Sequence, residues 1–287
     1  TKNMFSMTNC DFERLLNKDK DITGLDLSHT NLSKKSLGSL IKCLQTNNGS
    51  HVTRLILNEC PMEGTANEIL RIAHATNTIK HISLRNVKSE IEWSSIFLLI
   101  EDSSVEYLDV SHNHFKQIPQ IYTEKVNTTL RILKISRMRL KHEHMFAIIA
   151  IVKICRALEC IDISSNYGLI GRKDDARKLI RTMAENNRLS ELNCSHCLVG
   201  ISFMTDLFNK LTSLRKLDIS HNKFLQRKLY PRVSTRGLLD AIVFNTTIID
   251  LNFSNCGTLP KYIENNLEEI LSKNTTLTRL DINGYES

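Results

Sequence analysis

The sequence predicts an α/β solenoid, with short parallel strands on its concave face and helices on its convex face. A strand-and-turn pattern recurs along the chain, and the segments between its copies carry apolar residues at helical spacing. The clearest copy is LRKLDISHNKF, which starts at Leu214 and has apolar residues at Leu217 and Ile219 before Asn222. A short strand followed by a polar turn residue fits each copy.

Ten copies of this pattern follow one another. The mean step between them is about 28 residues, which lies in the range of leucine-rich repeats. The first apolar positions of the copies are Ile22, Val52, Ile79, Val105, Leu130, Leu158, Leu189, Leu214, Ile248 and Leu277. One repeat cannot bury its own apolar face, so the sequence predicts a leucine-rich-repeat horseshoe of about ten stacked repeats.

The turn position of Asn222 has a physical role in this pattern. The chain bends there, and a side-chain amide can hydrogen-bond turn backbone that would otherwise be buried without a partner. Cys60, Cys197 and Cys256 occupy the same position in other copies. Together with the repeat length, this use of Cys resembles the ribonuclease-inhibitor-like subclass of long repeats.

We expect the 287 residues to form a single leucine-rich-repeat domain, 1–287, because a solenoid core grows by one layer per repeat. The chain opens on Thr1 and stops just after a repeat strand, so we expect a fragment of a longer protein. The formal net charge of +7 allows an anionic partner without requiring one.

The chain contains eight cysteines. Besides the three turn positions, Cys194 replaces a core leucine, and Cys43 and Cys155 fall on expected helices. Buried, reduced thiols of this kind are typical of a cytoplasmic protein. The sequence has no secretory signal and no run of about eighteen apolar residues, so neither secretion nor a membrane span is predicted.

Several helices can be predicted in detail. Ser33 is a natural N-cap for a helix with Leu37 and Leu40 on its buried face. Trp93 is expected to pack in the core or at its rim. The segment YIENNLEEILSKN is expected to form one helix with its apolar residues, Ile263, Leu267, Ile270 and Leu271, on the buried side.

Side chains that alternate with the buried strand residues should face outward. The central outward row is Asp26, Ile56, Ser83, Asp109, Lys134, Asp162, Asn193, Asp218, Asn252 and Asp281, and the next row is mostly Ser. Neither row contains a large apolar strip, which favours polar recognition.

No enzyme is predicted. Asp109, Ser111 and His112 lie close in sequence, but they are repeated turn letters and nothing places a base on a nucleophile. His196 and His221 occupy equivalent places in neighbouring repeats, and we expect them to stack without holding a metal, since ligand partners are missing. No Gly-rich phosphate loop is present, so no cofactor or metal is expected.

The longest repeat step carries a basic insertion, Lys223–Arg236, which is the main candidate for partner binding. Its candidate residues are Arg227, Lys228, Tyr230, Arg232 and Arg236. Charge together with apolar anchors on a loop suits an acidic partner or an anionic membrane. The alternative is a solvated loop packed by its own apolar residues.

A second candidate lies on the strands. Arg85, Lys134 and Arg137 belong to repeats that flank the more acidic strand of Glu106 and Asp109. They could form a partner surface, or simply a solvated face with weak ion pairs across it.

Several segments resemble the leucine-rich-repeat domain of the CARMIL family: LDLSHTNLSKKSLGSLIKCL, LNECPM, NKFLQRKL, GLLDAIVFNTTIIDLNFSNC and EEILSKNTTLTRLDINGY. This resemblance implies a cytoplasmic regulator of actin capping and cortical actin assembly, with cortical actin regulators or myosin I as partners and a position near the cell cortex or plasma membrane. The family's capping-protein motif lies in a disordered tail that has no equivalent here. The matching positions belong to the repeat frame, so no functional residue is carried over.

The sequence therefore predicts a non-enzymatic protein-interaction scaffold similar to the CARMIL repeat domain. The alternative is a target-recognition module of a pathogen effector or of a ubiquitin-pathway subunit, which would use the same solenoid. An anion-binding surface for nucleic acid is a weaker third hypothesis, and nucleic acid is not the expected partner.

Overall fold

A computed structural model describes residues 12–19, 21–46, 51–62, 64–115, 125–222 and 235–284. The chain forms two compact units. The N-terminal unit comprises Thr1–Met138 and Ile154–Ala157, and the C-terminal unit comprises Arg139–Lys153 and Leu158–Ser287. The expectation of one domain over 1–287 stays a prediction.

The N-terminal unit alternates strands and helices along the chain. Its elements are α1 (Phe12–Lys18), β1 (Gly24–Asp26), α2 (Lys34–Gln45), β2 (Arg54–Ile56), α3 (Ala66–Thr76), β3 (His81–Ser83), β4 (Glu90–Ile91), α4 (Trp93–Glu101), β5 (Tyr107–Asp109), β6 (His114–Phe115) and β7 (Ile132–Lys134). Strands β4 and β6 pair in parallel as a separate two-stranded sheet.

The C-terminal unit follows the same plan. Its elements are the 3-10 helix η2 (His142–His144), α5 (Met145–Ile154), β8 (Cys160–Asp162), α6 (Lys173–Glu185), β9 (Glu191–Asn193), α7 (Ile201–Lys210), β10 (Lys216–Asp218), α8 (Thr235–Val243), β11 (Asp250–Asn252), α9 (Leu259–Asn265), α10 (Leu267–Lys273) and β12 (Arg279–Asp281). The last residue of α5 falls in the N-terminal unit.

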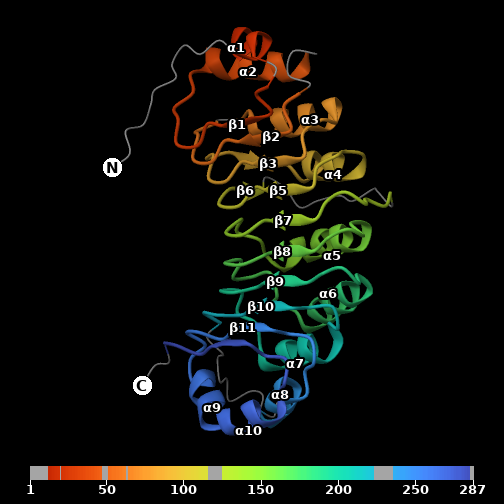
Figure 1. Cartoon of the computed structure of the whole chain (residues 1–287), viewed down its shortest axis with the longest axis vertical. Helices are drawn as coiled ribbons and strands as arrows, with labels where there is room; N and C mark the ends of the chain where they lie inside the picture. The colour runs from red at the N-terminus through yellow and green to blue at the C-terminus, as the bar shows by residue number, and fades with distance from the viewer. Residues whose placement is uncertain are drawn as a thin grey trace. The chain divides into compact units, whose positions relative to one another are not determined.

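The repeat strands pair in parallel and in sequence order within each unit. In the N-terminal unit the order is β1-β2-β3-β5-β7, with Leu25, Leu55, Ile82, Leu108 and Leu133 in register. In the C-terminal unit it is β8-β9-β10-β11-β12, with Ile161, Leu192, Leu217, Leu251 and Leu280 in register. Figure 1 shows the stacked strands of each unit with helices on one side of them. The predicted α/β leucine-rich-repeat solenoid is confirmed.

The predicted role of the turn Asn is confirmed. The Asn222 side-chain amide is fully buried and donates to the Cys194 carbonyl in the preceding repeat at 3.1 Å and to the Ile219 carbonyl in its own repeat at 2.8 Å. Its oxygen accepts from the N–H of Cys197 at 2.9 Å. Cys256, in the same position one repeat later, donates its thiol to the Ile219 carbonyl at 3.2 Å. Cys can replace Asn because its S–H makes the bond to the preceding repeat.

Two local predictions on the helices are also confirmed. The Ser33 hydroxyl accepts from the N–H of Ser36 at 3.1 Å and caps α2. Trp93 begins α4 and is buried, and its ring stacks on Phe115 with centroids 3.8 Å apart. Among the described residues, none of the helices has the length and apolar character that a bilayer span needs.

The prediction for YIENNLEEILSKN is wrong in one respect. The segment forms two helices, α9 and α10, because the chain departs from helical geometry at Asn266. Ile263 and Ile270 are buried as predicted, whereas Leu271 is 67% exposed.

Candidate functional site: the strand face of the N-terminal unit

In each repeat, three outward positions alternate with the buried residues. In the β10 repeat they are Lys216, Asp218 and Ser220, with Leu217 and Ile219 buried between them. The middle outward position carries Asp or Asn in most repeats, and its side chain has a structural role. The Asp109 carboxylate accepts the N–H of Ser111 at 2.9 Å, and the Asp218 carboxylate accepts the N–H of Ser220 at 2.9 Å. The same bond recurs at Asp26, Asp162, Asn193, Asn252 and Asp281.

These bonds explain the recurrent Asp-x-Ser sequence without catalysis. Each Asp is engaged by the backbone two residues later, and it does not orient His112 or His221 as a base. No group of three or more His, Cys, Asp or Glu side chains within the described ranges could hold a metal ion.

The turn residue that follows the Ser position has a positive φ, in the left-handed region, in all ten described repeats. Examples are His112, with φ of 62°, and Arg137, with φ of 50°. The N–H of His112 donates to the Ser136 carbonyl of the next repeat at 2.8 Å. The geometry therefore joins each turn to its neighbour and aligns the turn side chains in a row.

Three repeats of the N-terminal unit depart from the Asp or Asn rule. Ile56, Ser83 and Lys134 replace it in β2, β3 and β7. The Asn58 side chain supplies a substitute turn bond by accepting from the Ser83 hydroxyl at 2.7 Å and from the N–H of Arg85 at 3.0 Å. The departure removes carboxylates from this part of the strand face.

Aromatic and cationic side chains gather at the same repeats. The His81 and Tyr107 rings stack with centroids 4.0 Å apart and planes 6° apart, and the Lys134 ammonium lies 5.5 Å from the Tyr107 ring centroid. Arg54 precedes His81 in the same register row. We call Arg54, His81, Arg85, Tyr107, Lys134 and Arg137 the cation–aromatic patch.

The electrostatics of the patch keep its histidine neutral. Burial lowers the pKa of His81, and the Arg54 and Lys134 cations lower it further, while Asp109 acts in the opposite direction. Because an ordinary histidine titrates near pH 6.5, a lowered pKa leaves His81 uncharged at pH 7. The two stacked rings thus form an uncharged platform between cations.

The structure brings three of the residues predicted from the sequence onto the patch. Lys134 contacts Tyr107, and the Arg85 guanidinium lies 3.3 Å from Nε2 of His112. Arg137 is exposed on the turn of the next repeat. Sequence reasoning missed Arg54 and Tyr107, and it did not predict that His81 stacks on Tyr107. The available signal was a cation or aromatic residue two positions after the first apolar residue in three consecutive repeats.

Of the five candidate residues in the insertion Lys223–Arg236, the structure describes only Arg236. Arg227, Lys228, Tyr230 and Arg232 lie outside the described residues. Arg236 is described, and it forms a salt bridge with Asp240 at 2.9 Å and a bidentate one with Glu269 at 2.7 and 2.8 Å. The hydrogen bonds from Arg236 and then Lys273 lower the pKa of Glu269 to about 2. The charge of Arg236 is therefore compensated within the C-terminal unit by acids outside the insertion.

The strand face of the C-terminal unit has a different character. Its strand cations are paired with acids, Lys216 with Glu191 at 2.7 Å and Arg279 with Asp250 at 3.6 Å. On its turns, the predicted stacking of His196 on His221 is confirmed, with ring centroids 4.4 Å apart. The Tyr167 hydroxyl also lies 3.0 Å from Nδ1 of His196.

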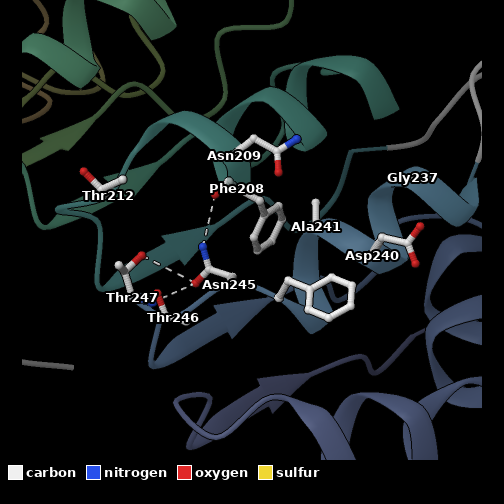
Figure 2. Close-up of a pocket in the computed structure, with 10 residues that line it drawn as sticks. Phe208, Asn209, Thr212, Gly237, Asp240, Ala241, Asn245, Thr246 and Thr247 are labelled. Atoms are coloured by element: carbon white, nitrogen blue, oxygen red, sulfur yellow. Dashed lines mark hydrogen bonds between the residues drawn. The ribbon is translucent and has the colours of Figure 1, made fainter.

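The C-terminal unit also has a pocket of about 370 Å³ between α7 and α8. Figure 2 shows the Asn245 side chain beneath it, donating to the Phe208 carbonyl at 3.1 Å and accepting from the N–H of Thr247 at 3.1 Å. Asp240 is the one titratable side chain among the described lining residues, and it is paired with Arg236. Among the described residues that were predicted from the sequence, Arg85, Lys134, Arg137 and Arg236, none lines this pocket.

Comparisons with known proteins agree with the fold. A family model described as "Leucine Rich repeat" matches residues 210–226. The chain is similar to the leucine-rich-repeat-containing protein LegL7 from Legionella pneumophila, with 13% identity, a TM-score of 0.53, and coverage of 97% of this chain and 89% of that chain. It is also similar to the tropomodulin C-terminal domain of Caenorhabditis elegans, with 17% identity, a TM-score of 0.38, and coverage of 50% of this chain and 83% of that chain. No curated protein matches the chain in sequence. From the LegL7 similarity, the match at residues 210–226 and the repeat geometry, we conclude that this chain has the fold of a leucine-rich-repeat solenoid.

Proposed function

We propose that this leucine-rich-repeat domain is a non-enzymatic scaffold that binds a protein partner through the cation–aromatic patch, in a cytoplasmic regulator of cortical actin assembly similar to the CARMIL family. The observation that carries the proposal is the local departure from the repeat rule. Where Asp or Asn gives way to Ile56, Ser83 and Lys134, the strand face also acquires its stacked rings and its cations. Local breaks of a repeat rule are expected at functional sites.

Two observations support a binding role. A leucine-rich repeat presents a continuous row of outward side chains on a rigid ladder, which suits recognition of an extended surface. The Asp and Ser residues that could suggest hydrolysis are engaged in turn bonds, for example Asp109 with the N–H of Ser111.

The cytoplasmic and actin-related part of the proposal has separate support. The described segments that resemble the CARMIL repeat domain, such as LDLSHTNLSKKSLGSLIKCL, lie in strands and helices of the repeat frame, while NKFLQRKL lies almost wholly outside the described residues. All described cysteines are thiols, and all except Cys160 are buried. Unpaired thiols in the core favour a reducing compartment.

The test is affinity capture from cytosolic extract with the immobilised full chain, with bound proteins identified by mass spectrometry. Three variants are compared with the parent: Arg85→Glu with Arg137→Glu on the patch, Lys34→Glu with Lys35→Glu on α2, and Arg227→Glu with Lys228→Glu and Arg232→Glu in the insertion. The α2 pair matches the patch pair in charge change. It adds acid to the first turn of a helix, where the helix dipole tolerates it.

We expect the parent and the α2 variant to capture cortical actin regulators or myosin, and the patch variant to lose them. Equal capture by the parent and the patch variant would remove the patch from the proposal. Loss in the insertion variant alone would place the contact on Lys223–Arg236. Capture of ubiquitin-pathway subunits, with no actin-related protein, would replace the actin role with target recognition for that pathway.

A further inference from the structure

We infer that the cation–aromatic patch recognises an extended acidic peptide segment of its partner, with carboxylates as the recognised groups. This inference rests on the proposed function and names the chemistry of the partner.

Three arginines of the patch, Arg54, Arg85 and Arg137, have no carboxylate within salt-bridge distance among the described residues. Arg54 and Arg137 form no ion pair there, and the near polar neighbour of Arg85 is the His112 ring at 3.3 Å. The contrast with the C-terminal unit is direct, because Lys216 and Arg279 both meet acids on their own strand face. A cluster of exposed cations attracts an anionic partner.

The missing carboxylates are those that the repeat would otherwise supply. In β2, β3 and β7 the middle outward position is Ile56, Ser83 and Lys134, whereas Asp109 remains in β5. Asp109 is buried and its oxygen is occupied by the N–H of Ser111. A partner carboxylate therefore meets little competition at the three altered repeats.

The stacked rings provide the second element of recognition. Tyr107 and His81 are both half-buried, and they lie parallel in neighbouring strands. An aromatic face contributes apolar contact area with little loss of side-chain entropy. The rings can hold the backbone or the aliphatic part of a peptide between the flanking cations.

The spacing of the cations matches an extended polypeptide. Strands β2, β3, β5 and β7 are consecutive in the sheet. Three strand spacings amount to about 14 Å, which an extended chain crosses in about four residues. A peptide that runs across the strands would thus place acids about four residues apart against Arg54 at one end and Lys134 or Arg137 at the other.

The acids that remain around the patch favour a peptide over a nucleic acid. Asp26 lies near enough to Arg54 to feel its charge, Glu106 pairs with Lys80 at 3.1 Å, and Glu59 lies 3.0 Å from Nδ1 of His29. A phosphodiester backbone carries charge at every step and would meet these carboxylates. A peptide with separated acids can avoid them.

The experiment measures the binding of defined probes to the full chain, with fluorescence anisotropy as the readout. The probes are a labelled peptide of alternating Glu and Gly, the same peptide with Gln in place of Glu, a single-stranded RNA of matched length, and vesicles of phosphatidylserine and phosphatidylcholine. The variants are Arg54→Gln with Arg85→Gln and Arg137→Gln on the patch, and Lys34→Gln with Lys35→Gln and Lys42→Gln on α2. Each of these two triple variants removes three positive charges from the N-terminal unit.

We expect the Glu peptide to bind the parent and the α2 triple with equal affinity, and the patch triple to bind roughly tenfold more weakly or worse. The Gln peptide should not bind. The affinity for the Glu peptide should fall with salt, and the salt dependence should be weaker in the patch triple. Circular dichroism of both triples shows whether the fold is retained.

Three results would overturn the inference. The first is no binding of the Glu peptide to the parent, and the second is equal binding to the patch triple. The third is tighter binding of RNA or vesicles with the same dependence on the patch, which would assign the site to phosphate groups. If the patch variant loses its captured protein but the Glu peptide does not bind, the protein-binding function stands and the acidic chemistry fails.

Discussion

The His81 ring stacks on the Tyr107 ring of the next repeat strand, with centroids 4.0 Å apart and planes 6° apart. This contact joins two repeats through the first outward position of their strands, the register row that also holds Arg54. Burial and the Arg54 cation lower the pKa of this histidine, so the stacked pair is uncharged at neutral pH. The stack is the centre of the cation–aromatic patch.

The first prediction concerns the titration of His81. We expect NMR to give an imidazole pKa below the ordinary value near 6.5, and Arg54→Gln to move it back toward that value. Because the folded pKa is lowered, the unfolded chain binds the proton more readily, and stability falls as pH drops below about 6.5. His81→Gln should remove this part of the pH dependence. A His81 pKa at or above the ordinary value would contradict the account of the patch.

The second prediction concerns the turn position of Asn222. Asn222→Ala leaves the N–H of Cys197 and the carbonyls of Cys194 and Ile219 without their partner, and should cost about 3 kcal/mol. Asn222→Cys should cost less, because a thiol can keep the bond to the preceding repeat. Urea unfolding checks both, with the exposed Asn209→Ala on α7 as control. Equal losses for Ala and Cys would show that the thiol does not act as a donor here.

The third prediction concerns the left-handed turn residues. Ser165 has φ of 56°, and its N–H donates to the Ser195 carbonyl at 2.8 Å. Ser165→Gly should stabilise the chain by up to about 1 kcal/mol, and Ser165→Val should destabilise it by about 1–2 kcal/mol. The same change to Gly at Ser202, inside α7, should lower stability because Gly disfavours helices. Thermal melts compare the three variants. Destabilisation by Ser165→Gly would contradict the turn geometry.

The fourth prediction concerns cysteine reactivity. Cys160 is half-buried on a strand, whereas burial raises the pKa of Cys197 and Cys256 to about 12 and that of Cys194 well above its usual range. The thiolate is the reactive form. We therefore expect iodoacetamide to alkylate Cys160 before the other described cysteines in the native chain, as monitored by peptide mass spectrometry. Denaturation should make all of them reactive. Early alkylation of Cys197 or Cys256 would show that the core around them opens.

Much of the fold could be predicted because each repeat carries the same physical requirement. The apolar spacing around Leu217 fixes which strand residues are buried, and the turn amide of Asn222 fixes where the chain bends. These are local constraints, and they can be read from one repeat. The prediction for Leu271 assumed one continuous helix, whereas the chain leaves helical geometry at Asn266, a break that the apolar spacing does not indicate.

The site could be predicted only in part. Arg85, Lys134 and Arg137 stood out as cations, but the stack of His81 on Tyr107 depends on superposing one repeat on the next. The pairing of Arg236 with Glu269 joins residues that are distant in sequence and belong to helices of successive repeats. Contacts between repeats have no signature within either repeat, so the sequence did not reveal that Glu269 pairs with Arg236.

The most direct measurement of the central claim is photo-crosslinking of the captured partner from two aromatic positions. A benzophenone amino acid replaces Tyr107 at the centre of the patch or, as control, Phe146 on helix α5, where the side chain is 41% exposed. The account predicts a partner adduct from position 107, competed by the Glu peptide, and none from position 146. An adduct from position 146 alone would place the partner on the helices and contradict the claim that the patch is the binding surface.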